Sequence, residues 1–256
     1  MRNVVLFGGA GYIGRHLVKE VAGRGDNPIC LDTVDRGCFD FVSVAATINH
    51  LFKYRLGERT EGTDFIHLAC PRNKPDTWYL EGACRALDDG IELASKLPNG
   101  HRLFVSSMSV HDEPASQYGT FKRTAEVAAE MAGFGIIRLG TVLGAEVCYR
   151  NDLGLHVIAG RLAKGWDAWV NGNVERNVMT IQSAVEEILK FPEFREIGGL
   201  AAYKDIVQGL GVTVQDGSTG FCSSFGSAVA PLVLAQLKCT FAKLINDIRE
   251  NKVWAC

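Results

Sequence analysis

A tyrosine and a lysine four positions apart, Tyr118 and Lys122, are the residues whose types and spacing point most directly to chemistry. Residues four apart on a helix share a face, one turn from each other. A free phenol ionises near pH ~10 and is a poor base at neutral pH, but a neighbouring ammonium stabilises the phenolate. A tyrosine so placed can take a proton from a substrate hydroxyl or return one to a carbonyl. The hydroxyls of Ser106 and Ser107, which close the preceding predicted strand, could orient the reacting oxygen.

A glycine-rich turn near the N-terminus supplies the context that gives this pair its weight. Residues 4–7 read as a short buried strand, and Gly8, Gly11 and Gly14 follow at every third position before an apolar pattern of helical spacing. Gly8 permits a tight turn, Gly11 lets a pyrophosphate approach the backbone, and Gly14 lets the helix pack close to the sheet. The helix N-terminus then faces the phosphates, so the stretch predicts a dinucleotide site.

An acidic residue at the end of the second predicted strand bears on the choice of cofactor. The strand 28–32 ends at Asp32, 18 positions after Gly14. A carboxylate there accepts hydrogen bonds from the adenine ribose and repels a 2′-phosphate, so NAD is favoured over NADP. Arg15 and Arg36 leave NADP open, because a guanidinium near the ribose could hold the extra phosphate.

Composition narrows the class of protein and the partners. At 256 residues, 47% hydrophobic and 22% charged, the chain is an ordinary globular protein with room for a sizeable core. A net charge of −2 gives no electrostatic footprint for nucleic acid or an anionic membrane. The sequence suggests neither a signal peptide nor a spanning segment. Scattered cysteines without a C-x-x-C motif predict neither a metal site nor disulfides, and we expect a cytoplasmic protein.

Alternating strand and helix patterns predict the fold class. Over residues 1–145 they predict an α/β, doubly wound parallel (Rossmann) sheet, with a weak helix near 41–51 and a strand near 52–56. Beyond this point the alternation becomes irregular. We expect residues 146–256 to form a small mixed C-terminal substrate lobe, with segments about 176–203 returning to the Rossmann domain.

Several motifs, taken in chain order, resemble those of the extended short-chain dehydrogenases/reductases. More narrowly, the chain resembles the NAD-dependent epimerase/dehydratase group, in particular UDP-galactose 4-epimerase-like nucleotide-sugar epimerases, of which it would be a shortened member. The resemblance covers roughly residues 3–145. The motifs that carry it are Gly8-x-x-Gly11-x-x-Gly14, Asp32, His67-Leu68-Ala69, Val105-Ser106-Ser107-Met108-Ser109-Val110, Tyr118-x-x-x-Lys122 and Arg138-Leu139-Gly140-Thr141-Val142-Leu143-Gly144.

The resemblance implies a role for each matching catalytic and cofactor residue. Tyr118 would be the acid/base, Lys122 would bind the nicotinamide ribose and support the phenolate, and Ser107 would hydrogen-bond the reacting sugar oxygen. The residues implied to contact the cofactor are Gly8, Gly11, Tyr12, Ile13, Gly14, Asp32, Leu68, Ala69 and Lys122.

For the substrate, the resemblance implies contacts with Ser107, Thr141 and Arg176. Thr141 stands where the family usually has an asparagine, and Arg176 lies in a segment like the one whose arginine holds the nucleotide diphosphate. Met108 and Ser109 replace the two acids of the family's dehydratases, which argues against dehydration. His67 is interpreted as a packed, hydrogen-bonded histidine rather than a catalyst.

These patterns leave three functions open. The first is an NAD-dependent nucleotide-sugar epimerase that transfers hydride with a tyrosine acid/base. The second is an NAD(P)-dependent reductase or dehydrogenase of a keto sugar or another small carbonyl or hydroxyl compound. The third is a non-catalytic dinucleotide-binding regulatory protein. By resemblance we also expect a homodimer, paired through helices at about 78–97 and 115–132.

Overall fold

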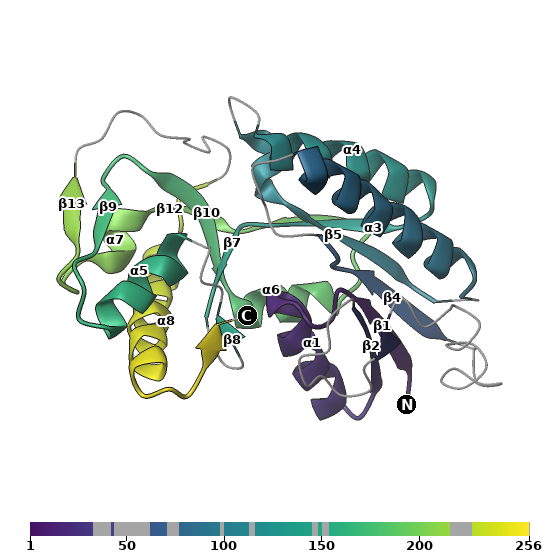
Figure 1. Cartoon of the computed structure of the whole chain (residues 1–256), viewed down its shortest axis with the longest axis horizontal. Coiled ribbons are helices and arrows are strands. Elements are labelled where there is room, and N and C mark those ends of the chain that lie inside the picture. The colour runs from purple at the N-terminus through teal and green to yellow at the C-terminus, as the bar shows by residue number, and fades with distance from the viewer. Residues whose placement is uncertain are drawn as a thin grey trace. The chain divides into compact units, whose positions relative to one another are not determined.

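The protein divides into two compact units, each built from three segments of the chain (Figure 1). The computed structural model describes residues 1–32, 42–43, 62–70, 77–97, 100–112, 116–144, 148–149, 154–215 and 227–255. Unit 1 comprises Met1–Ser106, Phe121–Ile137 and Glu187–Arg195; unit 2 comprises Ser107–Thr120, Arg138–Glu186 and Glu196–Cys256. The domain division predicted from sequence, between residues 145 and 146, stays a prediction.

The main sheet has seven strands in the order β11-β6-β5-β4-β1-β2-β3. Strand β1 pairs in parallel with both β2 and β4, and the parallel pairing continues from β2 to β3 and from β4 to β5. The predicted doubly wound α/β sheet is therefore confirmed. The strand bounds are β1 Asn3–Phe7, β2 Asn27–Asp32, β3 Val42–Ser43, β4 Thr63–His67, β5 Arg102–Ser107, β6 Gly135–Leu139 and β11 Phe194–Ile197.

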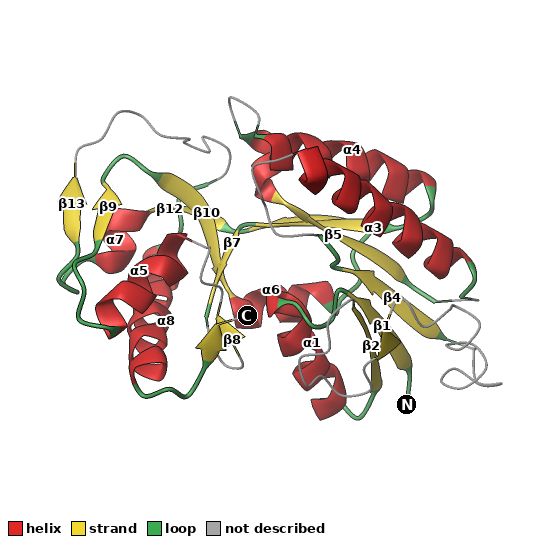
Figure 2. Ribbon diagram, in the orientation of Figure 1, coloured by secondary structure: helices red, strands yellow, loops and turns green. Residues whose placement is uncertain are grey.

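The central strands are apolar along their length because helices cover both faces of the sheet. Helices α3 (Thr77–Ser95) and α4 (Gln117–Met131) lie side by side over one face, and α1 (Tyr12–Gly23) lies over the other (Figure 2). Phe7 and Phe65 belong to the buried cluster beneath α3 and α4. Alternate residues of a strand point to opposite faces, so a single run such as β1 serves both layers.

Unit 2 contains short strands that pair in both parallel and antiparallel directions. Its sheets are β12-β10-β7, β13-β9 and β14-β8. Helices α5 and α8 bury Leu155 and Phe241 in its core. The bounds are η2 Met108–His111, β7 Thr141–Leu143, β8 Cys148–Tyr149, α5 Gly154–Ala163, β9 Trp169–Asn171, β10 Glu175–Thr180, α6 Ile181–Ile188, β12 Gly199–Ala202, α7 Tyr203–Val207, β13 Thr213–Gln215, α8 Pro231–Arg249 and β14 Trp254–Ala255.

Two local predictions need correction and one lies outside the described residues. The weak helix expected near residues 41–51 is wrong at Val42–Ser43, which form β3 beside β2 because sheet pairing overrides a weak helical pattern. The short helix α7 was not predicted, because a helix of only five residues carries almost no periodic signal. The strand expected near residues 52–56 falls outside the described part of the chain.

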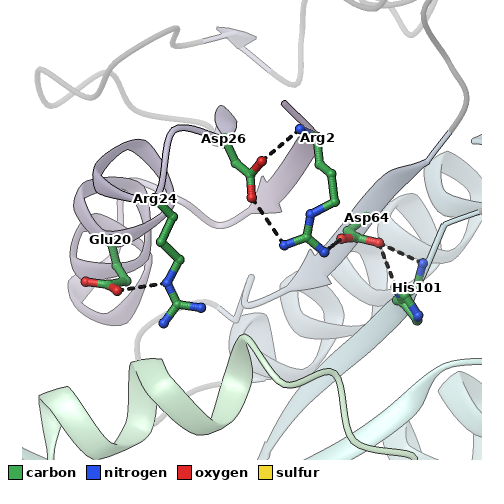
Figure 3. Close-up of polar contacts among 6 residues, drawn as sticks. All are labelled: Arg2, Glu20, Arg24, Asp26, Asp64 and His101. Atoms are coloured by element: carbon green, nitrogen blue, oxygen red, sulfur yellow. Dashed lines mark hydrogen bonds and ion pairs between the residues drawn. The ribbon is translucent and has the colours of Figure 1, made fainter.

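A polar network lies at the end of the sheet where strands β1 and β4 begin (Figure 3). The Arg2 guanidinium contacts Asp64 Oδ2 at 3.1 Å and Asp26 Oδ2 at 3.2 Å. Asp64 Oδ1 also accepts the backbone N–H of His101 at 3.0 Å and lies 2.9 Å from its Nδ1. The Asp64 side chain is only 3% exposed, so its charge is compensated at the sheet edge rather than by water.

Candidate functional site

Gly8 turns the chain at the end of β1 and packs against the segment that follows β4. Its φ of 92° lies in the region that side chains disfavour. A Cβ added there would lie 2.6 Å from the Ala69 backbone nitrogen. The Gly8 N–H donates to the Leu31 carbonyl at 2.7 Å, which ties the turn to β2. The predicted cofactor residues Gly8, Leu68 and Ala69 therefore belong to one cluster of backbone.

Helix α1 begins directly after this turn, at Tyr12. Its N-cap is Gly11, which offers no side chain to the amides of the first turn. A Cβ on Gly11 would meet only the Gly8 carbonyl oxygen, at 3.2 Å, whereas one on Gly14 would lie 2.6 Å from Gly9 Cα. Gly14 thus allows close packing of the helix on the turn, and Gly11 lets the backbone at the helix start lie against the Gly8 carbonyl without a side chain between them. A phosphate is the group such a helix N-terminus attracts.

Both peptide groups of Ala10, within the turn, are held by charged side chains. Asp32 Oδ2 accepts the Ala10 N–H at 3.0 Å. Arg15 Nε donates to the Ala10 carbonyl at 2.9 Å, and the Arg15 side chain is buried. The guanidinium considered as a partner for a 2′-phosphate therefore contacts the turn itself. Arg36, the other candidate, lies outside the described residues.

The Lys122 ammonium is buried against the end of β5. Its Nζ donates to the Val105 carbonyl at 2.9 Å and lies 4.7 Å from the centroid of the Phe104 ring. A charged hydrogen bond and a cation–π contact together offset part of the cost of burying this ammonium. Ser106 follows in the strand, and its Oγ is buried without a hydrogen-bond partner.

His67, at the end of β4, shares this environment but is held as a neutral packed ring. Its Nε2 donates to the Ala86 carbonyl of α3 at 3.0 Å, and its ring packs edge-on to Phe7. Burial, reinforced by the charge of Lys122 and opposed by the Ala86 bond, lowers the pKa of His67 to about 4. The interpretation of His67 as a packed histidine is confirmed.

Ser107 and Tyr118 both belong to unit 2, where η2 and the first turn of α4 contact each other. Ser107 is the N-cap of η2, and its Oγ accepts the Ser109 N–H at 3.2 Å. Tyr118 is in the first turn of α4 and is partly exposed. A Cβ on the next residue, Gly119, would lie 2.2 Å from the Ser109 carbonyl, so α4 approaches η2 as closely as glycine allows. Tyr118 and Lys122 share α4, four positions apart as predicted.

Unit 2 also holds a hydrogen-bonded group of three charged or titratable side chains. Glu196 Oε1 accepts from Arg138 Nη1 at 2.6 Å and contacts His111 Nε2 at 2.7 Å. Burial alone would raise the pKa of Glu196, but the hydrogen bonds from His111 and Arg138 outweigh it and keep that pKa below its ordinary value. The group anchors the end of η2 to β6 and β11.

Arg176, on β10, and Thr141, on β7, lie in neighbouring strands of the same small sheet. Arg176 Nη1 lies 3.7 Å from Asp112 Oδ1. Burial raises the pKa of Tyr203, although a hydrogen bond with Thr141 and the charge of Arg176 oppose that rise. The sheet thus brings together two of the three residues that the resemblance assigns to substrate, with Asp112 and Tyr203 beside them.

The predicted residues therefore fall into two groups. Unit 1 contains Gly8, Gly11, Tyr12, Ile13, Gly14, Asp32, Leu68, Ala69 and Lys122, and unit 2 contains Ser107, Tyr118, Thr141 and Arg176. Sequence reasoning missed Glu196 and Tyr203, which are distant in sequence from the residues they contact and match no motif. Asp112 lies between Ser107 and Tyr118 in the sequence, and this position was the available signal.

Metal and membrane features were searched over the described part of the chain. There, no group of three or more His, Cys, Asp or Glu side chains is arranged to hold a metal ion. Of the helices described, none has the length and apolarity needed to cross a membrane.

Comparison with known proteins identifies the fold. No protein-family model and no curated protein sequence matches the chain. Among solved structures, MoeE5 in complex with UDP-glucuronic acid and NAD is 20% identical, with a TM-score of 0.74 over 98% of this chain and 100% of that one. A Bacillus cereus UDP-glucuronic acid 4-epimerase, with UDP-glucuronic acid and NAD, is 15% identical, with a TM-score of 0.72 over 98% and 100%.

A Thermus thermophilus UDP-glucose 4-epimerase in complex with NAD is also similar, at 18% identity and a TM-score of 0.70 over 95% of this chain and 99% of that one. The chain therefore shares the fold of these three solved structures.

Proposed function

We propose that this protein is an NAD-dependent nucleotide-sugar epimerase. One observation carries the proposal: a single helix, α4, bears Tyr118 and Lys122, and its lysine is bonded to the strand that leads directly into Ser107. The fold, shared with a UDP-glucuronic acid 4-epimerase over 98% of the chain, supports this interpretation of the arrangement. Fold alone would not assign an activity.

The residues around the glycine turn fit a dinucleotide. The absence of a side chain at Gly11, and of a side-chain cap at the start of α1, suits a pyrophosphate. Asp32, already oriented by the Ala10 N–H, would accept the adenine ribose hydroxyls, and Lys122 would hold the nicotinamide ribose. When bound there, NAD would accept a hydride from a sugar carbon and return it.

Proton transfer and substrate orientation belong to the chain's own side chains. The Tyr118 phenolate would take the proton of a sugar hydroxyl as the carbon that carries this hydroxyl loses hydride. The product is a ketone. Ser107 would hold the reacting oxygen, and Thr141 and Arg176 would hold the rest of the nucleotide sugar. Return of the hydride to the opposite face, with the proton returned from Tyr118, gives the inverted alcohol with no net redox change.

A reductase or dehydrogenase of a smaller carbonyl compound is the second candidate, and the Asp112–Arg176 pair favours it. The arginine assigned to a diphosphate already has a carboxylate 3.7 Å away. Such an enzyme would use Tyr118 and Lys122 in the same way but would consume its cofactor stoichiometrically.

We also propose a homodimer that works in the cytoplasm. Val127 and Met131 lie one turn apart on α4 and are 57% and 87% exposed. Two exposed apolar side chains on one helix face suit pairing with a second copy, as the resemblance implies. Sedimentation velocity of the wild type and of Met131→Glu would test this pairing.

Proton NMR of the protein with NAD and a panel of UDP-, GDP- and dTDP-sugars tests the function. New anomeric signals without accumulation of NADH establish an epimerase and name its substrate. Stoichiometric NADH establishes a dehydrogenase instead. Absence of any reaction across the panel, with NAD still bound, contradicts the proposal and favours a small non-sugar carbonyl substrate or a regulatory protein.

A further inference from the structure

A carboxylate and a guanidinium face each other beside the residues assigned to substrate. Asp112 directly follows η2, and Arg176 lies on β10. Their side chains are 11% and 24% exposed, and Arg176 Nη1 lies 3.7 Å from Asp112 Oδ1. That separation gives Coulomb attraction but is too long for a hydrogen bond. Arg176 Nη1 is also buried and has no hydrogen-bond acceptor among the described residues.

The carboxylate is held in this place by its own element. The Asp112 N–H donates to the Ser109 carbonyl at 3.2 Å, and the Ser109 side chain hydrogen-bonds the Asp112 carboxylate. The preceding residue, His111, is anchored by Glu196. Asp112 is therefore a fixed counter-charge for Arg176 and not a mobile surface acid.

We propose that Asp112 is a specificity-determining residue that competes with a substrate's phosphate for Arg176, and so weakens binding of dianionic nucleotide sugars. This inference rests on the proposed function, in which Arg176 holds the diphosphate. A phosphate oxygen would satisfy the unpartnered Nη1 and form a charged hydrogen bond, but it would also be repelled by the nearby carboxylate. The site therefore favours ligands whose attraction to Arg176 exceeds their repulsion by Asp112.

The competition depends on pH in a defined direction. Charged or titratable groups acting on Asp112 are Arg176 from β10 and His111 in η2. Burial raises the pKa of Asp112, although Arg176, the Ser109 hydroxyl and His111 oppose that rise. Asp112 therefore loses its charge at a higher pH than a free aspartate does, and Arg176 binds phosphate more strongly as the pH falls. UDP-glucose is a suitable probe, because its diphosphate diester keeps both charges across this range.

Isothermal titration of UDP-glucose into the NAD-loaded protein tests the proposal. Asp112→Asn removes the charge and keeps the shape, and we expect UDP-glucose to bind about tenfold more tightly at pH 7.5. Wild type should gain affinity between pH 7.5 and 5, whereas the variant should show little of that gain. Glu175→Gln is the matched control: it removes the same charge one residue from Arg176, on the opposite face of β10, and should change affinity less than twofold.

Two results would overturn the proposal, and they differ. If wild type and Asp112→Asn bind UDP-glucose equally at both pH values, while Arg176→Met weakens binding, Asp112 does not compete and the proposed function still stands. If no form of the protein binds UDP-glucose at either pH although NAD binds normally, the inference and the nucleotide-sugar function fail together. The pH series on wild type gives an answer even if a variant does not fold.

Discussion

The charged side chains around the predicted cofactor residues and those around the predicted substrate residues make different contacts. In unit 1, Asp32 and Arg15 both bond the backbone of Ala10, and Lys122 bonds the backbone of Val105. In unit 2, the charged side chains pair with one another, Arg138 with Glu196 and Arg176 with Asp112. Among these residues, the charges in unit 1 bond backbone groups, whereas the charges in unit 2 pair with one another.

This difference teaches how each half would receive a ligand. A turn whose shape is already fixed by its own hydrogen bonds can accept a phosphate without giving up a contact. Such a pre-organised site lowers the free-energy cost of binding. A paired arginine must exchange one anion for another, so its affinity depends on what its present partner does. Cofactor binding should therefore depend on backbone geometry, and substrate binding on charge balance.

The largest effect should come from Tyr118→Phe. This substitution removes the proposed acid/base, which is required for neither cofactor binding nor substrate binding. We expect turnover of the reacting sugar to fall by about 10³-fold, because general acid–base catalysis contributes on the order of 10² to 10⁴. Affinity for NAD and for UDP-glucose should each stay within about twofold. NMR progress curves and titration calorimetry on the same preparation measure both; unchanged turnover would remove Tyr118 from the mechanism.

Gly8→Ala tests whether the cofactor half depends on backbone shape. The substitution places a Cβ 2.6 Å from the Ala69 nitrogen at a φ of 92°. Strain and overlap together should cost about 3 kcal/mol, as loss of stability, of NAD affinity or of both. Gly25→Ala is the control, since Gly25 has a φ of 79° but no atom within 4 Å of the added Cβ. It should cost about 1 kcal/mol and leave NAD affinity unchanged; equal effects would show that φ alone matters at Gly8.

The same contrast explains which parts of the molecule could be predicted from sequence. The sheet, the glycine turn and the Tyr118–Lys122 helix follow from local patterns, because each depends on residues a few positions apart. Glu196 could not be predicted as the partner of His111 and Arg138, since the pairing joins positions 85 and 58 residues away. The Asp112–Arg176 pair likewise depends on tertiary structure. Residues that act through distant charge partners leave no periodic signal.

Asp64→Asn separates stability from binding within unit 1. The buried Asp64 carboxylate bonds Arg2 and His101 at the edge where the strands begin, and the variant turns amide hydrogens toward those donors. We expect a loss of about 2 kcal/mol in the free energy of unfolding, below the range for fully buried pairs because Arg2 is 52% exposed. NAD affinity should not change. Glu20→Gln, in the exposed pair with Arg24, is the control and should cost less than about 0.5 kcal/mol in urea unfolding.

A pH-dependent loss of stability should come from His67, a buried group of unit 1 that carries no charge when folded. Its pKa of about 4 lies below the ordinary value of 6.5, because burial and the Lys122 charge disfavour the protonated ring. As the pH falls, the unfolded chain binds a proton before the folded protein does, so stability is lost between about pH 7 and 4 and the loss levels off below. By pH 5 it should reach about 2 kcal/mol.

Urea unfolding of wild type and His67→Gln at pH 7.5 and 5 measures this loss, because subtracting the two proteins removes the titration of carboxylates they share. The difference in unfolding free energy should shrink toward pH 5 by about 2 kcal/mol. An NMR titration of the ring gives a measurement that does not need the variant: the His67 signals should keep their neutral shifts down to about pH 5. If the His67 ring protonates near its ordinary pKa, unit 1 accommodates a second positive charge beside Lys122. The claim that His67 is held as a neutral ring would then be wrong.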